Sequence, residues 1–435
     1  MNQSRADYPT RKIFVFSTLT LFTAGLSFSL RASIIGTLEA QYLASIDPAH
    51  SGEMAGQLLG IAFLGFASTL FLASVFLDAI GQGRSLLIAA SAFVVGTTMT
   101  LAAPALAEGP GVYDLLWLGF LLSGLGWGFM EAAVNPLVAA LYPEDKTNRL
   151  NIVHAWWPAG IIAGGLIELG LGALGIGWQA RFGMILLPAT VAITLYFGTR
   201  FPRTERAAAG VSMADMFREI PRKPMFLVWW VCMFLTASSE LAPGQWIDLT
   251  LTRTVGMRGI WLLIYVSGMM FVLRHFAGPI AHRISNVGML WGSAVLASLG
   301  LLALARVDSP TMAIGAATVW GLGVCFMWPT MLANVSERYP RGGELFVGLM
   351  GVAGALAINF VLPQLGAIFD RAKIEVAGGP EAFAALSGQP LQEVLRSAAG
   401  TSFQTLAILP AILIVVFAAL ALVDRARGYQ PERLN

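Results

Sequence analysis

The sequence has 435 residues, of which 56% are hydrophobic and only 12% are charged. A soluble protein of this length carries about twice that charged fraction, so the composition excludes a soluble enzyme. The formal net charge is only +2, and no basic domain suggests nucleic-acid binding. The chain is therefore expected to be a membrane protein with the lipid bilayer as its surroundings.

Twelve long apolar runs follow one another along the chain, separated by short polar or Pro- and Gly-containing breaks. A helix needs roughly 20 apolar residues to cross the hydrocarbon core, and each run approaches or exceeds that length. The predicted spans are residues 13–38, 54–77, 85–107, 113–141, 149–174, 179–200, 225–251, 259–281, 287–306, 311–335, 344–369 and 401–423. The predicted fold class is thus an all-α membrane protein with twelve transmembrane helices.

Basic residues are distributed unevenly among the connections between these spans. Arg5, Arg11 and Lys12 precede the first span, and the alternate loops on the same side hold most of the remaining Lys and Arg. By the positive-inside rule both termini are then cytoplasmic. The excess of Arg over Lys and the abundant Ala and Gly suggest a GC-rich bacterial genome, so we expect a multi-pass protein of the bacterial inner membrane.

The longest cytoplasmic connection divides the spans into two sets of six. It is basic and contains Pro202, Pro221 and Pro224. This pattern indicates a linker between two helical bundles. The predicted domains are an N-terminal six-helix bundle (1–200), a cytoplasmic linker (201–224) and a C-terminal six-helix bundle (225–435).

Two matching segments support a duplication. The fourth span contains GLGWGFM at 124–130 and continues to Tyr142, and the tenth contains GLGVCFM at 321–327 and continues to Tyr339. In each copy a proline follows the tyrosine, and the spacing between the copies is constant. The two halves are therefore predicted to share one scaffold.

A second repeated pattern lies in the loops after the second and eighth spans. The first copy has Asp78, Gly81 and Arg84, and the second has Arg283 but puts His282 where the acid is expected. Both copies resemble the loop motif of the major facilitator superfamily. The resemblance implies the major facilitator fold, in which the two six-helix bundles are pseudo-symmetric.

The loop motif also has a physical interpretation. A carboxylate at a helix end can accept bonds from the N-terminal amides of a neighbouring helix and pair with a nearby Arg. A contact of this kind that forms in only one conformation biases alternating access. Asp78, Gly81, Arg84 and Arg283 are therefore predicted gating residues, and the alternative is an ordinary loop that positions a hairpin.

Polar residues inside the spans carry most of the functional information, because inserting a charge costs about 2.5–3.5 kcal/mol. Glu131 lies in the fourth span, Asn135 lies one turn later on the same face, and His154 lies at similar depth in the fifth span. Desolvation favours the protonated form of a carboxylate, and His154 could share the proton. Glu131 and His154 are predicted to couple transport to protons, and the alternative is a structural pair that holds the two spans together.

The segment 131–151 is similar to the fourth-to-fifth-helix region of fucose- and glucose-type sugar–proton symporters, through its EAAVNP, YP and RLN sequences. In that branch a Glu at this place is implicated in proton coupling, which the resemblance assigns to Glu131. The same resemblance implies sugar contacts near His154 and Trp157. The chain departs from the branch in its first span. The symporter's acid aligns near Ser33, whereas this span has no acid before Glu39 and carries Arg31.

The predicted substrate contacts combine charged, aromatic and amide residues. Arg31 and Glu240 lie at similar depth in the first and seventh spans, which line the central cavity in this superfamily, so we expect them to face each other. The alternative is that each pairs locally within its own half. Aromatic faces stack on sugar rings and amides bond hydroxyl groups. The other predicted contacts are Asn135, Trp157, Gln245, Trp246, Trp328, Asn334 and Asn359.

The predicted function is secondary transport of a small polar solute, a sugar or related polyhydroxy compound, by alternating access with proton coupling. A proton-driven efflux antiporter is the nearest alternative, because residues 160–165 match an antiporter signature except for its proline. A non-transporting sensor with a transporter fold is the other. We expect no enzymatic activity, cofactor, metal or nucleic-acid partner, and a monomer that binds a small-molecule substrate. Substrate identity, direction and coupling ion stay open.

Overall fold

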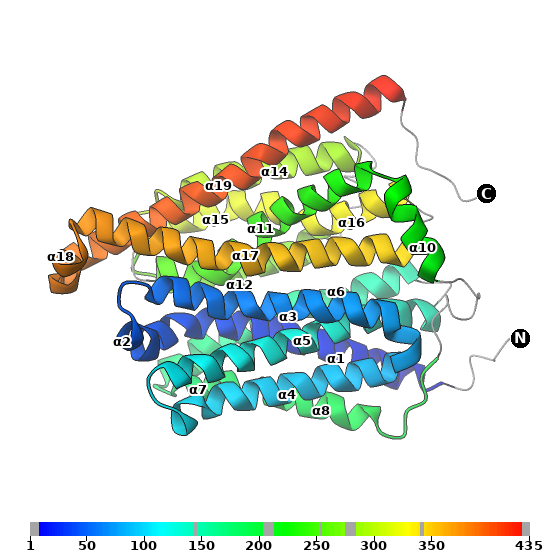
Figure 1. Cartoon of the computed structure of the whole chain (residues 1–435), viewed down its shortest axis with the longest axis horizontal. Helices are drawn as coiled ribbons and strands as arrows, with labels where there is room; N and C mark the ends of the chain where they lie inside the picture. The colour runs from blue at the N-terminus through cyan, green and yellow to red at the C-terminus, as the bar shows by residue number, and fades with distance from the viewer. Residues whose placement is uncertain are drawn as a thin grey trace, which may run out of the picture. The chain divides into compact units, whose positions relative to one another are not determined.

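The structure is a computed structural model that describes residues 8–142, 146–202, 213–252, 255–274, 284–339 and 343–428. Those residues form helices joined by short connections and contain no strand (Figure 1). Among them, eleven helical segments are long and apolar enough to cross a membrane, with Trp178–Tyr196 and Pro310–Val335 counted as one segment each, and one shorter apolar helix, α12 (Ile260–Arg274), accompanies them. The prediction of an all-α membrane protein is confirmed.

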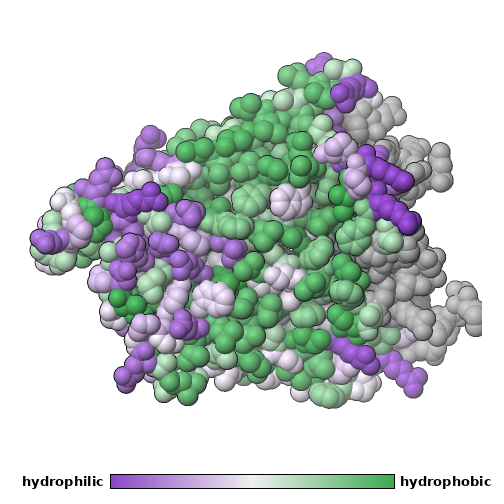
Figure 2. Space-filling model, viewed as in Figure 1, coloured by the Kyte–Doolittle hydropathy of each residue, from purple (hydrophilic) through white to green (hydrophobic). Residues whose placement is uncertain are grey.

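The surface agrees with this assignment. Figure 2 shows hydrophobic residues over the middle of the visible face, with hydrophilic residues gathered toward its ends. Large apolar side chains such as Leu227 and Val415 are 64% and 70% exposed. A soluble protein rarely exposes such a continuous apolar surface, whereas a bilayer solvates it.

By its internal contacts the chain divides into two compact units. Unit 1 comprises Met1–Leu30 and Ile61–Glu219, and unit 2 comprises Arg31–Gly60 and Ile220–Asn435. Two helices, α1 (Thr10–Leu38) and α3 (Ser51–Ile80), contribute to both units. The predicted boundaries of the two six-helix bundles stay a prediction.

Unit 1 holds the first part of α1, the second part of α3 and the helices that follow them. These are α4 (Gln82–Leu106), α5 (Pro110–Leu141), α6 (Lys146–Ala173), α7 (Trp178–Gly183), α8 (Leu186–Tyr196) and α10 (Met213–Glu219). The predicted sixth span corresponds to the apolar segment Trp178–Tyr196, which comprises α7 and α8.

Unit 2 holds the remaining parts of α1 and α3 and the C-terminal helices. These are the π-helix η2 (Glu39–Leu43), α2 (Ala44–Ile46), the 3₁₀-helix η3 (Ile220–Arg222), α11 (Met225–Leu251), α12, α14 (Asn286–Leu304), α15 (Pro310–Val324), α16 (Met327–Arg338), α17 (Gly343–Ala377), α18 (Pro380–Ala385) and α19 (Gly388–Arg427). Residues 275–281 of the predicted eighth span lie outside the described residues.

The structure adds detail to two predictions for unit 2. The predicted tenth span lies in one apolar segment, Pro310–Val335, but this segment contains a break, because α15 ends at Val324 and α16 begins at Met327. Residues 370–400, between the last two predicted spans, are mostly helical, since α17 runs on to Ala377 and α19 begins at Gly388. Hydropathy detects only the part of a helix that lies in lipid, whereas Ala, Leu, Glu and Arg also favour helix beyond it. Figure 1 shows the short helix α18 at the turn between α17 and α19.

The repeated glycine motif packs helices against each other in both units. A Cβ atom on Gly124 of α5 would lie 1.9 Å from the carbonyl oxygen of Ala62 in α3. A Cβ atom on Gly323 of α15 would lie 2.3 Å from the backbone nitrogen of Ala297 in α14. Small residues let membrane helices approach this closely. The shared motif is therefore a packing feature of the scaffold.

Candidate functional site

Glu131, Asn135 and His154 form one hydrogen-bonded chain in unit 1. Asn135 Nδ2 donates to Glu131 Oε1 at 3.4 Å, and His154 Nε2 lies 2.6 Å from Asn135 Oδ1. Because that amide oxygen only accepts, His154 is the donor. All three side chains are half-buried. The structure thus brings together Glu131 and Asn135, predicted on one face of the fourth span, and His154, predicted at similar depth in the fifth, and a single amide links the two titratable groups.

An aromatic cluster lies beside this chain. Trp127, one turn before Glu131 on α5, stacks on Phe66 with ring centroids 4.5 Å apart and an interplanar angle of 12°. Trp157, a predicted substrate contact, has its ring centroid 5.3 Å from that of Phe28 and 6.3 Å from that of Trp127. Trp127 is not among the predicted contacts, although its i, i+4 spacing to Glu131 indicates a shared face.

The predicted contacts of the seventh span are buried in unit 2. Glu240 is 5% exposed, and Gln245 and Trp246 are fully buried. Arg31 is 2% exposed and belongs to the same unit. Direct pairing of Arg31 with Glu240 across the substrate stays a prediction.

The remaining predicted contacts lie on α16 and α17. The backbone nitrogen of Trp328 donates to Glu240 Oε2 at 3.3 Å, so these two predicted residues do meet. Asn334 accepts from Arg338 Nε at 3.0 Å. Asn359 is half-buried, and a Cβ atom on Gly60 of α3 would lie 3.0 Å from its carbonyl oxygen.

The predicted gating residues are only partly described. The side chain of Asp78 and the whole of Arg283 lie outside the described residues. Gly81 forms the turn between α3 and α4 with φ of 88°, a conformation that a side chain would strain. Arg84 is exposed. This geometry is what a hairpin-positioning loop requires, and the gating role stays a prediction.

A carboxylate that caps a neighbouring helix does occur in unit 2, outside the set of predicted site residues. Asp370 of α17 accepts from the backbone nitrogens of Gly52 and Glu53 at 3.3 and 2.8 Å, in the first turn of α3. Lys373 Nζ lies 2.5 Å from Asp370 and 3.4 Å from the carbonyl oxygen of Pro48. The side chains of Asp370 and Lys373 are 5% and 3% exposed. An ion pair therefore fixes the start of α3 on α17.

Two further ion pairs were also missed. Arg338, at the end of α16, bonds both carboxylate oxygens of Asp424 on α19 and lies over the ring of Trp229, 4.8 Å from its centroid. In unit 1, Arg181 of α7 pairs with the buried Glu168 of α6. Bidentate Arg–carboxylate pairs hold helices in a defined orientation.

The loop before α3 contains one titratable pair outside the spans. His50 Nδ1 lies 2.8 Å from Asp47 Oδ2. This hydrogen bond raises the pKa of His50 and lowers the pKa of Asp47. Both side chains are substantially exposed, so the contact is open to solvent.

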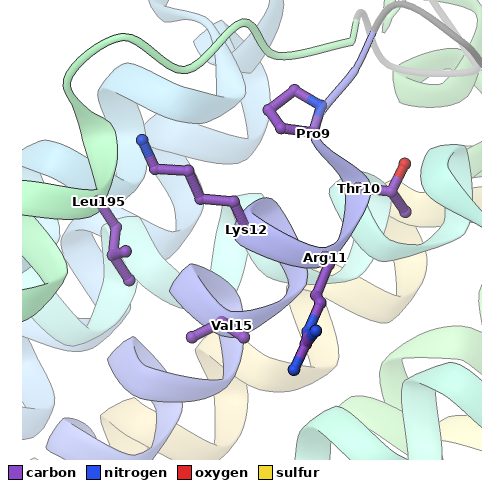
Figure 3. Close-up of a pocket in the computed structure, with 6 residues that line it drawn as sticks. All are labelled: Pro9, Thr10, Arg11, Lys12, Val15 and Leu195. Atoms are coloured by element: carbon purple, nitrogen blue, oxygen red, sulfur yellow. The ribbon is translucent and has the colours of Figure 1, made fainter.

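A cavity of about 540 Å³ lies at the start of α1, next to the end of α8 (Figure 3). Its lining residues are Pro9, Thr10, Arg11, Lys12, Val15 and Leu195. Lys12 Nζ donates to the carbonyl oxygen of Phe197 at 2.9 Å. None of the predicted site residues lines this cavity, so it adds nothing to the candidate site.

The sequence profile of the Major Facilitator Superfamily matches residues 17–362. The chain belongs to the Major Facilitator Superfamily. The superfamily predicted from the loop motif is thus confirmed, and with it the assignment as a transporter that binds small molecules within the membrane. No curated protein matched the chain.

Solved structures of the superfamily share the fold. The xylose transporter XylE from E. coli, partially occluded and inward open, has a TM-score of 0.72 at 12% identity and covers 94% of this chain and 99% of its own. A bacterial homolog of the human lysosomal transporter Spinster has a TM-score of 0.70 at 17% identity over 97% and 98%. The nucleoside transporter NupG has 0.70 at 11% over 93% and 99%. At such identities the likeness shows the fold alone.

Proposed function

We propose that this superfamily member is a proton-coupled transporter of a sugar or related polyhydroxy compound. The observation that carries the proposal is the hydrogen-bonded chain from Glu131 through Asn135 to His154. The aromatic rings of Trp127 and Trp157 beside that chain suit a sugar ring. A D-xylose–proton symporter is among the solved structures that share the fold, with a TM-score of 0.71 at 14% identity.

The chain suggests how a proton and a substrate could be linked. The ionised carboxylate of Glu131 makes a charge-assisted bond with the amide of Asn135. Protonation of Glu131 removes that charge and weakens its hold on the amide. Asn135 also accepts from His154, so a change at either titratable group reorients the amide that hydroxyl groups of a substrate could bond. Proton binding and substrate binding would then share one hydrogen-bonding group.

The proposal includes the untested expectations from the sequence. The protein would work as a monomer in the bacterial inner membrane, with both termini in the cytoplasm. Arg31, Glu240, Gln245, Trp246, Trp328, Asn334 and Asn359 would complete the substrate site, and the loop-motif residues would gate access to it.

The test is uptake by proteoliposomes across a panel of labelled sugars, with and without an imposed proton gradient. Glu131→Gln is expected to keep exchange of internal for external sugar but to lose gradient-driven accumulation, because the amide still bonds Asn135 yet carries no proton. Glu108→Gln, an exposed acid between α4 and α5, is the matched control and should behave as wild type. Undiminished accumulation by Glu131→Gln removes Glu131 as the proton carrier, and absence of transport for every sugar removes the substrate class.

The efflux alternative loses its main sequence argument. Its signature glycines lie on α6 and pack against α1 within unit 1. A Cβ atom on Gly160 would lie 2.2 Å from the carbonyl oxygen of Phe22, and one on Gly164 would lie 2.8 Å from Ser29 Cβ. Helix packing alone therefore requires small residues at these positions. Drug sensitivity of a deletion strain, compared with sugar uptake, separates efflux from symport.

A further inference from the structure

The seventh span contains a break in its hydrogen-bond ladder. Pro243 lies inside α11 and has no N–H group, so the carbonyl oxygen of Ser239, four residues earlier, lacks its helical donor. The indole nitrogen of Trp320 donates to this oxygen at 3.1 Å in buried surroundings. Trp320 lies on α15 and is only 2% exposed. The unpaired carbonyl group of Ser239 in the seventh span thus accepts a hydrogen bond from the tenth span.

The tenth span has a break of its own, between α15 and α16. Pro329, in the first turn of α16, cannot donate to the carbonyl of Cys325, and its ring crowds that carbonyl. The helix therefore restarts, and its first amides need acceptors. Phe326, at the N-cap position, makes no side-chain capping bond. The acceptor comes from the seventh span instead, because Trp328 N donates to Glu240 Oε2 at 3.3 Å.

Polar groups left unpaired at the two breaks therefore hydrogen-bond with the other span through two consecutive residues of α11, Ser239 and Glu240. Ser239 holds the end of α15, and Glu240 holds the start of α16. The Trp328 ring closes the arrangement against α17, since a Cβ atom on Gly354 would lie 2.5 Å from Trp328 Cζ3. All these contacts lie within unit 2.

We propose that Glu240 is a positioning residue that caps α16 and, with Ser239, makes the proline break of the seventh span and the break of the tenth span move as one. A charged carboxylate is a stronger cap than a neutral acceptor, so whatever neutralises or engages Glu240 loosens the start of α16. The inference needs neither the sugar nor the proton of the proposed function. Glu240 would then act in conformational change, whereas a residue that only contacts substrate would not need to cap α16.

The first test measures hydrogen–deuterium exchange of the backbone amides of residues 326–332, apart from Pro329, in the full-length protein in proteoliposomes. Glu240→Ala is expected to accelerate exchange there by roughly fivefold, the effect of losing one helix cap. Glu240→Gln should give an exchange rate between those of the wild type and Glu240→Ala, because its amide oxygen still accepts from Trp328 but is a weaker cap than the charged carboxylate. If Glu240→Ala does not fold, the same exchange is measured in Glu240→Gln and Trp320→Phe, because both substitutions preserve packing. Unchanged exchange in Glu240→Ala overturns the capping role, as does a Gln variant that behaves like the Ala variant.

The second test asks whether the two breaks are coupled through Ser239. Trp320→Phe removes the indole donor and should speed exchange across the 325–326 break. In a Pro243→Ala background the new amide can bond Ser239 within α11, so the same substitution should have less than half that effect. Trp229→Phe is the matched control, because Trp229 is equally buried on α11 and its indole nitrogen has no hydrogen-bond partner in the described part of the chain. Equal effects in both backgrounds overturn the coupling.

Discussion

Removing the carboxylate of Asp370 should destabilise unit 2 more than removing its cationic partner. Asp370→Ala leaves Lys373 buried at 3% exposure without its counter-charge and leaves the first-turn amides of Gly52 and Glu53 without their acceptor. Breaking a buried pair costs about 3–5 kcal/mol, and losing a helix cap costs about 1 kcal/mol. The expected loss is therefore about 4–6 kcal/mol.

The opposite substitution should be milder. Lys373→Met keeps the apolar stem near the ring of Phe383, which now lies 5.3 Å from Nζ, and leaves Asp370 with two backbone donors. The double variant Asp370→Ala/Lys373→Met removes both charges, so its loss should fall below the sum of the single losses by about 2–3 kcal/mol.

The assay is reversible unfolding of the purified protein in mixed micelles, followed by tryptophan fluorescence, for the two single variants and the double variant. The control cycle uses Arg396 and Asp308, an ion pair at 3.8 Å whose side chains are 45% and 54% exposed. Solvent screens that pair, so its coupling energy should stay below about 1 kcal/mol. The reasoning is refuted if the Asp370–Lys373 cycle is additive, or if its coupling energy is no larger than that of the exposed pair.

Two further predictions concern packing and protonation. Gly124→Ala should lower the free energy of unfolding by about 1–3 kcal/mol, because its Cβ would lie 1.9 Å from the carbonyl oxygen of Ala62. Gly170→Ala, whose Cβ would meet nothing within 4 Å, should be silent in the same unfolding assay. Asp47→Asn should bring the raised pKa of His50 back toward its ordinary value in an NMR titration. The wild-type contact weakens as the pH rises through the pKa of His50 or falls through the lowered pKa of Asp47. An unchanged His50 titration would contradict the pairing.

Part of the candidate site could be predicted from local spacing. Glu131 and Asn135 lie four residues apart, so any helix places them on one face, and a hydrogen bond joins them. Pro243 is a local signal of a break in the seventh span, because it has no N–H group. Pro329 is the same kind of local signal in the tenth span, yet the apolar run around it was interpreted as one helix, because hydropathy does not register a missing N–H group.

By itself the sequence determined that the chain crosses a membrane many times, that it is helical, and which superfamily it belongs to. These properties depend on apolar length and on short motifs, which neighbouring residues establish without any tertiary partner. Only the tertiary structure decided which polar groups meet. Asp370 bonds an amide 318 residues away, Trp320 a carbonyl 81 residues away, and Arg338 a carboxylate 86 residues away. No periodicity encodes such distances, because helix packing in a bilayer sets the partners of each orphaned polar group.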